Sequence, residues 1–297
     1  MPNPSKVQPF SVRQFFQRFP DDATCLRHVM EVRYGLRHQC AKCRKDSTFH
    51  RLADRPAYSC AHCGHHVYPC AGTIFQDSRT PLQVWFYAIY LFIATRNGVS
   101  GKELQRVLGV TYKTAWRMGQ QIRLLMDKAD GEMLLCGHVE LDEAYVGGRR
   151  RGSKPGRGAA GKTIAMGMKE RDGRMDTAVI PNVKRETLRG VVIESVQAGS
   201  IVSTDELIGY ALLPGDGYRH GTVRHGYGEF AKRDEMLGVV HHTNNLENFW
   251  RLFKNAVKST HIHVSAKYMD RYLNEFAFRS NHRHVGNAMF DLLIGAV

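Results

Sequence analysis

The sequence lacks the features that are typical of membrane, secreted and repeat proteins. Its longest apolar run, residues 84–94, has eleven residues, which is too short to cross a bilayer and suits a buried helix. The N-terminal stretch has no apolar signal core, and the chain shows neither an internal repeat nor a long low-complexity tract. We therefore expect neither membrane insertion nor secretion.

Acidic residues are scarce. The 297 residues include 28 Asp and Glu against 42 Lys and Arg, a formal charge of +14, while 43% hydrophobic residues exclude a disordered chain. Such a balance favours a polyanionic partner, most often nucleic acid. The charge is uneven. Residues 1–135 carry +9, residues 149–174 carry +7 and residues 251–283 carry +5, whereas the rest of 136–297 carries −7.

The segment 147–162 is rich in Gly, Arg and Lys and has no acid, so it cannot bury a core and is predicted to be a mobile basic loop. We expect it to contact DNA phosphates, because clustered cations repel one another without a polyanion. An ordinary solvated hairpin tip is the alternative. The basic residues concerned are Arg149, Arg150, Arg151, Lys154 and Arg157.

The cysteine count of seven is odd, which argues against a disulfide framework. Two CxxC pairs, Cys40 with Cys43 and Cys60 with Cys63, are separated by sixteen residues, a spacing typical of a tetrahedral thiolate site. Zinc in a ribbon of short strands is the favoured metal, and iron in a rubredoxin-like site is the competing one. Surrounding basic residues favour nucleic-acid binding over electron transfer. We expect the other three cysteines, Cys25, Cys70 and Cys136, to be small core residues, and the histidines beside the second pair, His62, His65 and His66, to lie outside the ligand set.

Residues 81–126 are predicted to be helical, with Pro81 in the first helical position. Ser100 with Glu103 forms a capping-box pattern, Gly109 provides a turn, and Thr111 can cap the next helix. This spacing is typical of a helix–turn–helix, whose second helix would present Tyr112, Lys113 and Arg117 to DNA. Its apolar faces are predicted to comprise Leu104, Val107 and Leu108 on the first helix and Trp116, Ile122 and Met126 on the second. A structural hairpin between domains is the alternative.

After residue 136 the pattern changes to strands. In residues 138–146, Val139 and Leu141 alternate with Glu140 and Asp142. Further strands are predicted at 163–168, 176–180 and 200–205, and helices at 184–197, 245–258 and about 266–279, while residues 230–240 remain unassigned. This order predicts an α/β domain with a mixed sheet.

Three acids in this region can converge: Asp142 on the first strand, Asp205 at the end of a later strand, and Glu247 on a helix. Carboxylates held together repel, so they would need divalent cations, and hard oxygen ligands select Mg²⁺ or Mn²⁺. Solvated acids at strand ends are the alternative.

The segments HVELDEAYVGG from residue 138, HTNNLENFWRLFK from residue 242 and YLNEFAFRSNHR from residue 272 resemble insertion-sequence transposases. With the two CxxC pairs, the chain is similar to the zinc-ribbon ISXO-like transposases, which carry a DDE catalytic domain of RNase H-like fold. The resemblance implies three parts: residues 1–80 with the zinc ribbon, a helix–turn–helix region over 81–135, and a catalytic domain over 136–297. It also implies a multidomain α+β protein of the bacterial cytoplasm that associates with the nucleoid.

By this resemblance, Asp142, Asp205 and Glu247 are the catalytic acids and hold two Mg²⁺ or Mn²⁺ ions for strand cleavage and transfer of the freed 3′-hydroxyl to target DNA. Glu206 is a substitute for Asp205 or its neighbour, and Glu140 and Glu143 shape the local charge. Arg251, Lys254 and Lys258 would bind flanking phosphates. His242 and Asn244 would position substrate or the metal ligands, unless Asn244 or Asn245 simply caps the helix.

The implied partners are the terminal repeats, target DNA and further copies of the chain. Two other functions stay open. One is a non-catalytic DNA-binding regulator whose C-terminal domain is a dimerisation scaffold, and the other is a metal-dependent nuclease that does not join strands.

Overall fold

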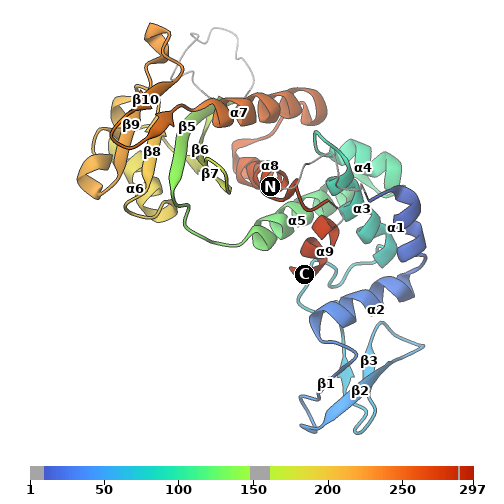
Figure 1. The fold of residues 1–297 in the computed structure, drawn as a ribbon. Coiled ribbons are helices and arrows are strands. Elements are labelled where there is room, and N and C mark those ends of the chain that lie inside the picture. The colour runs from blue at the N-terminus through green and yellow to red at the C-terminus, as the bar shows by residue number, and fades with distance from the viewer. Residues whose placement is uncertain (1–9, 148–160, 287) are drawn as a thin grey trace. The chain divides into compact units, whose positions relative to one another are not determined.

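The computed structural model describes residues 10–147, 161–286 and 288–297 (Figure 1). Its contacts divide the chain into two compact units, Met1–Ala129 with His282–Val297, and Asp130–Asn281. This division differs from the three parts expected from the sequence, because the last helix, α9 (Ala288–Gly295), packs against α2 (Asp22–Arg33) and α3 (Leu82–Ala94). Among the described residues, no helix is both long and apolar enough to cross a membrane.

The first unit has an aromatic core. Its first helix, α1 (Val12–Arg18), begins with a capping box between Ser11 and Gln14. Buried phenylalanine rings from three helices and the loop after α1 meet with centroids 5.0–6.2 Å apart, and these are Phe15, Phe19, Phe86 and Phe290. Burying such a ring stabilises the fold by about 1.5–3 kcal/mol. The last helix is therefore part of the core that the first helices begin.

Three helices follow where the sequence predicts helix. In α3, Leu82 is the first residue and Pro81 takes the N-cap position, one residue later than expected. Ser100 caps α4 (Gly101–Leu108) as expected, since its hydroxyl accepts the N–H of Glu103 at 3.1 Å. Gly109 has a φ of +67°, which suits the turn that leads into α5 (Tyr112–Asp130).

The capping of α5 follows the prediction, whereas the apolar faces do so only in part. The Thr111 hydroxyl accepts the N–H of Thr114 at 3.3 Å. Ile122 and Met126 are buried, but Trp116 is only half-buried and Val107 is 43% exposed. An eight-residue helix packs along a single row of side chains, and in α4 that row centres on Leu104, which is fully buried.

The ribbon lies between α2 and α3 in the sequence. Its strands are β1 (Arg37–Gln39), β2 (Asp46–Arg51), β3 (Tyr58–Cys60) and β4 (His66–Val67), which pair antiparallel in chain order. Gly64, after the second cysteine pair, has a φ of +69°, as that turn requires.

The second unit contains a five-stranded mixed sheet with the order β7-β6-β5-β8-β9. The strands β5 (His138–Val146), β6 (Thr163–Glu170) and β7 (Met175–Ile180) pair antiparallel, and β8 (Ile201–Thr204) and β9 (Arg219–Thr222) pair parallel to β5. The predicted mixed sheet is confirmed. No strand was predicted at β9, and the unassigned segment forms the hairpin β10 (Lys232–Asp234) and β11 (Val239–His241).

Helices cover both faces of the sheet (Figure 1). One core joins α6 (Arg185–Ser195) to Val139 and Leu141 of β5. The other joins α7 (Asn244–Ala256) and α8 (Met269–His282) to Ala144 and Val146. Alternation along β5 therefore places Asp142 on the face that α7 covers.

Candidate functional site

The four paired cysteines form one cluster. Cys40 and Cys63 have sulfurs 3.7 Å apart, and Cys43 and Cys60 have sulfurs 3.9 Å apart. All four sulfurs lie within 4.8 Å of one another. A tetrahedral zinc with Zn–S bonds of about 2.3 Å needs sulfurs about 3.8 Å apart, so the cluster fits the ion.

A neighbouring hydroxyl prepares one of these thiols, that of Cys60, to bind metal. The Cys60 sulfur lies 3.2 Å from the Ser47 hydroxyl, and this hydrogen bond lowers the pKa of Cys60 to about 5, toward the thiolate that metals bind. Burial instead raises the pKa of Cys25 to about 12, which suits the core position predicted for it. Cys136 is exposed, so the prediction of a core residue was wrong there.

The candidate acids come from neighbouring elements of the second unit. In the parallel pair, Glu140 of β5 lies opposite Ser203 of β8, so Asp142 is level with Asp205, which directly follows β8. Glu247 lies in the first turn of α7, which packs on β5 and β6. The three acids therefore come from neighbouring elements, with Asp142 in the middle of β5, Asp205 just after β8 and Glu247 at the start of α7.

The pKa of Asp142 reflects the charges of the other two acids. Burial is the largest cause that raises its pKa, followed by the charges of Asp205 and Glu247, and together they bring it to about 7. Lys254, two turns after Glu247, acts in the opposite direction. Within the described residues only the four cysteines have all their ligand atoms within 4.8 Å, so the three carboxylates lie farther apart than that. Their carboxylate oxygens are the kind of donor that suits a hard divalent cation.

A glycine sets how closely α7 approaches the sheet. Gly167 of β6 lies opposite Asp142 in the antiparallel register. A Cβ at Gly167 would lie 2.8 Å from the Trp250 ring and 2.9 Å from the Leu246 side chain, distances that real contacts do not show. Only glycine leaves room here for the helix that carries Glu247.

A fully buried carboxylate fixes the start of the same helix. Glu140 accepts hydrogen bonds from the Asn245 backbone N–H at 3.1 Å and from its side-chain amide at 2.7 Å. Its Oε1 also lies 3.0 Å from Arg171 Nε and 3.2 Å from His242 Nδ1. Asp142 is two residues from Glu140 on the same face of β5. The hydrogen bonds between Glu140 and Asn245 therefore connect the strand that carries Asp142 to the helix that carries Glu247. The sequence suggested only local charge shaping for Glu140.

The structure also places the other residues named around these acids. Glu206 accepts the backbone N–H groups of His225 at 2.8 Å and Gly226 at 3.2 Å. Glu143 accepts the hydroxyl of Tyr210. Thr243 takes the N-cap position of α7 without a side-chain cap, so neither asparagine that follows it is the N-cap residue.

A chain of buried polar groups supports the strand that leads to Asp205. The Ser203 hydroxyl lies 2.7 Å from His138 Nε2 and 2.8 Å from His241 Nδ1. Burial lowers the pKa of His138 to about 4, so this ring is neutral at pH 7. A Cβ at Gly221 of β9 would overlap the His241 ring, which explains the glycine.

The structure describes some of the candidate phosphate-binding cations and not others. Arg251 and Lys254 are exposed on α7, and Lys258 is exposed in the helical segment Val257–His261 that follows it. On α5, Tyr112, Lys113 and Arg117 are exposed as predicted, and Lys102 lies over the Tyr112 ring at 4.7 Å. Five of the six basic residues of the expected loop, Arg149, Arg150, Arg151, Lys154 and Arg157, lie outside the described residues.

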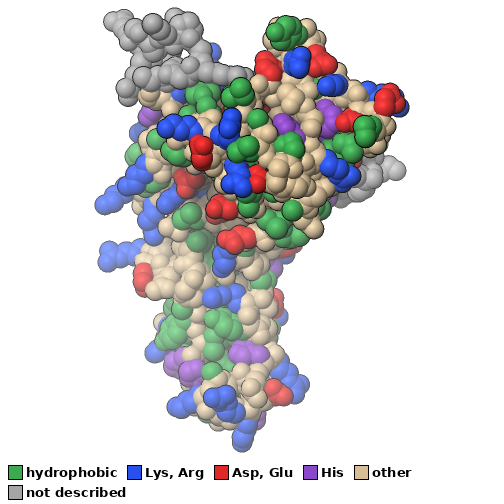
Figure 2. Space-filling model, turned by 90° about the vertical axis from the view of Figure 1, so that its left-hand side faces the viewer, with side chains coloured by type: hydrophobic (Ala, Val, Ile, Leu, Met, Phe, Trp, Pro, Cys, Tyr) green, Lys and Arg blue, Asp and Glu red, His purple; other side chains and the backbone are tan. Residues whose placement is uncertain are grey.

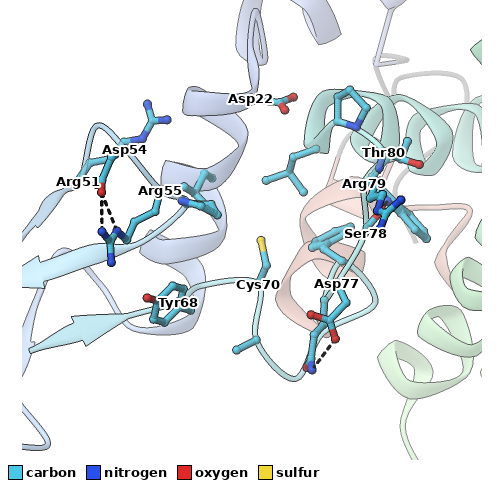
Figure 3. Close-up of a pocket in the computed structure, with 18 of the residues that line it drawn as sticks. Asp22, Arg51, Asp54, Arg55, Tyr68, Cys70, Asp77, Ser78, Arg79 and Thr80 are labelled. Atoms are coloured by element: carbon cyan, nitrogen blue, oxygen red, sulfur yellow. Dashed lines mark hydrogen bonds and ion pairs between the residues drawn. The ribbon is translucent and has the colours of Figure 1, made fainter.

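The first unit also contains a cavity of about 770 Å³ between the ribbon and the start of α3 (Figure 3). Arg51, Arg55 and Tyr68 line it from the ribbon, and Arg79 lines it from the segment before α3. Three acids, Asp22, Asp54 and Asp77, balance the three arginines. Figure 2 shows further Lys, Arg and His side chains around the ribbon at the bottom of the view.

Two family models match the chain. Residues 134–281 match the ISXO2-like transposase domain, and residues 20–66 match the transposase zinc-ribbon domain. The chain belongs to the zinc-ribbon ISXO2-like transposases. The transposase-domain match covers the mixed sheet with α7, and the zinc-ribbon match covers all four clustered cysteines.

Two relatives agree with this assignment. An uncharacterized protein in transposable element ISH50 of Halobacterium salinarum is 28% identical over 272 residues, which cover 84% of this transposase-family chain and 88% of the relative. An uncharacterized transposase-like protein of Haemophilus influenzae is 28% identical over 109 residues, covering 37% of the chain and 82% of that protein.

Proposed function

We propose that this protein is the transposase of an insertion sequence, which cuts DNA at the ends of the element and joins them to target DNA. The observation that carries the proposal is the raised pKa of Asp142 beside Asp205 and Glu247, within a family of DDE transposase domains. Three neighbouring carboxylates are a ligand set that suits the metal ions of a phosphoryl-transfer site.

The sheet order supports an RNase H-like catalytic domain, because β6 is antiparallel to both neighbours while β5, β8 and β9 are parallel. We assign residues 136–297 to this catalytic part, 1–80 to the zinc-ribbon part and 81–135 to a helix–turn–helix that reads DNA through Tyr112, Lys113 and Arg117. The exposed basic surface of α5 and the ribbon supports DNA binding by both.

In this proposal, Asp142, Asp205 and Glu247 hold two Mg²⁺ or Mn²⁺ ions. When bound, such ions activate the attacking oxygen and stabilise the leaving oxygen of the phosphodiester. Lys254, with Arg251 and Lys258, holds the neighbouring phosphates. Glu140, with His242, keeps Glu247 in place. One phosphodiester replaces another during strand transfer, so no nucleotide cofactor is required.

The protein would act on the two element ends as a homo-oligomer in the bacterial cytoplasm, bound to the nucleoid. We do not assign it the role of a non-catalytic regulator, because a dimerisation scaffold gives no reason for three acids to meet on one side of β5.

Cleavage and joining on DNA from the element's own ends test the proposal. With Mg²⁺, the wild-type protein should cut and join, whereas Asp142→Asn, Asp205→Asn and Glu247→Gln should bind the same DNA without cutting it. Glu235→Gln is a matched control, because Glu235 is 81% exposed in the β10–β11 turn. Wild-type binding without metal-dependent nicking would show a regulator, and nicking without joining would show a nuclease.

A further inference from the structure

The segment between β9 and β10 exposes aromatic rings beside the candidate acids. Tyr227 is 87% exposed and Phe230 is 59% exposed, although rings of this size are usually covered. Single exposed apolar residues are ordinary, but a group of them beside a reaction site indicates an interaction surface. No residue of this segment belongs to the catalytic machinery described above.

The segment is held in one conformation. In its helical turn, His225–Tyr227, the backbone N–H groups of His225 and Gly226 donate hydrogen bonds to the Glu206 carboxylate. Gly228 follows with a φ of +76°, and the Glu229 carboxylate accepts the backbone N–H of Arg224 at 3.2 Å. The two rings are therefore presented from a fixed turn, which reduces the ordering cost of binding.

The turn lies against the acid on α7. His225 Nδ1 is 3.5 Å from Glu247 Oε1, and the Phe230 ring lies with its centroid 5.5 Å from that of His225. The Phe230 ring is therefore within reach of a nucleotide a few positions or fewer from a phosphodiester at Glu247.

Cations flank the rings on both sides in the sequence. Arg224 precedes them and Lys232 follows them, and both side chains are exposed. Aromatic rings between cations are typical of surfaces that bind an unpaired strand, where the rings stack on bases and the cations contact phosphates.

We infer that Tyr227 and Phe230 form a stacking site for an unpaired nucleobase next to the phosphodiester that is cut. This inference rests on the proposed function. It also assigns Glu206 a role different from metal binding: Glu206 holds the turn that presents the rings. Because aromatic faces accept every base, the site would favour an opened helix rather than a particular sequence.

The test uses the full-length protein and a duplex of the element's own end, with 2-aminopurine as the base next to the cut. Binding should change the fluorescence of this base as it leaves the helix stack and meets a ring. Tyr227→Ala and Phe230→Ala should reduce that change and slow cutting by roughly 5- to 100-fold, the range expected for one lost stacking contact. Tyr227→Phe keeps the ring and should restore both signals.

Met236→Ala is the matched control, because Met236 is 97% exposed in the nearby hairpin but carries no ring. An abasic nucleotide at the probe position should slow the wild-type protein and leave Tyr227→Ala unaffected, as expected if ring and base act as one pair. Equal fluorescence and cutting in wild type, Tyr227→Ala and Phe230→Ala would overturn the inference. A changed oligomeric state with an unchanged fluorescence signal would also overturn it, since the rings would then bind protein.

Failure of the proposed function gives a different pattern. A wild-type protein that shows the ring-dependent fluorescence change but cuts no DNA would refute transposition and keep the stacking site. A protein that cuts normally without any fluorescence change would refute the stacking site alone. A protein with neither property would refute both.

Discussion

At the scale of single residues, Asp142 has a pKa far above that of an exposed aspartate. Its pKa is about 7 in the folded protein against 3.8 for an exposed aspartate. Between about pH 4 and 7, the folded protein therefore keeps a proton that the unfolded chain releases. The stability that this group contributes is present at low pH and is lost as the pH rises through that window.

Asp142→Asn cannot ionise, so we expect it to unfold at a higher temperature than wild type at pH 8 without added metal. The gain should be a few degrees, since 1 kcal/mol corresponds to about 2–4 °C for a unit of this size. The difference should shrink at pH 4. Adding Mg²⁺ should raise the melting temperature of wild type more than that of the variant. Parallel pH and Mg²⁺ responses in both proteins would contradict this interpretation.

Glu140 gives a second prediction at this scale. Glu140→Ala removes the acceptor of Asn245 and leaves Arg171 and His242 without their buried partner. Removing one member of a buried charged pair costs about 3–5 kcal/mol, so the urea midpoint should fall markedly. Glu235→Ala, at an 81% exposed position, should change it little. An unchanged midpoint for Glu140→Ala would show that α7 is held by its apolar face alone.

At the scale of elements, the contact between α7 and β6 depends on one missing side chain. Gly167→Ala would push Trp250 and Leu246 away and move the helix that carries Glu247. We expect a loss of about 1–3 kcal/mol in unfolding free energy and a larger loss of cutting, because a small displacement of a catalytic group is costly.

Gly190→Ala is the matched control for that change. A Cβ at Gly190 in α6 would meet nothing within 4 Å, and alanine in a helix is favoured over glycine by about 1 kcal/mol. This variant should therefore be slightly more stable, with cutting unchanged. Similar effects from the two substitutions would remove the argument for close approach at Gly167.

The ribbon gives the fourth prediction. Its strands are short, so we expect its folding to depend on metal. Wild type should contain about one zinc per chain by elemental analysis, and Cys40→Ser should lose it. Cys136→Ser changes an exposed cysteine outside the cluster and should keep the zinc. Bound iron instead of zinc would support the rubredoxin-like alternative.

Local sequence patterns predicted the elements well where neighbouring residues alone determine the secondary structure. The alternation in residues 138–146 defined β5 to the residue, and the cap at Ser100 defined the start of α4. By contrast, β9 consists of Arg219, His220, Gly221 and Thr222, which show no apolar alternation. It forms a strand because it pairs with β8, and this pairing leaves no mark in the local pattern of the four residues.

The candidate site, like the fold, could be predicted only in part from the sequence. The strand pattern named Asp142 within the first strand and Asp205 at the end of a later one. The burial of Glu140 depends on the packing of α7, which the sequence does not display. Gly167 did leave a signal, because an isolated glycine inside a strand pattern indicates that another element approaches closely.

At the scale of the whole molecule, the second unit begins and ends at one place. The Asn281 side chain donates a hydrogen bond to the Asp130 carboxylate at 2.7 Å, and it accepts the backbone N–H of Met175 at 2.8 Å. Both ends of the unit are thus fixed to β7. A unit with its own core and joined ends has what it needs to fold alone.

We therefore expect residues 130–281, expressed alone, to unfold cooperatively and to be stabilised by Mg²⁺. A shorter control, residues 130–260, lacks α8, which supplies buried residues such as Leu273 and Phe276. It should be unfolded by circular dichroism and sensitive to protease. An unfolded 130–281 fragment would show that this unit depends on the rest of the chain.

The position of α9 has a consequence for how the protein is made. Phe290 completes the aromatic core that Phe15 and Phe19 begin, yet the ribosome adds it only after the whole second unit. At about 5–20 residues per second, the α1–α5 region waits roughly ten to thirty seconds for its final helix, while the inserted unit can fold in the meantime. A nascent or prematurely terminated chain would expose phenylalanine side chains to chaperones and proteases, so only finished molecules would have the complete first unit.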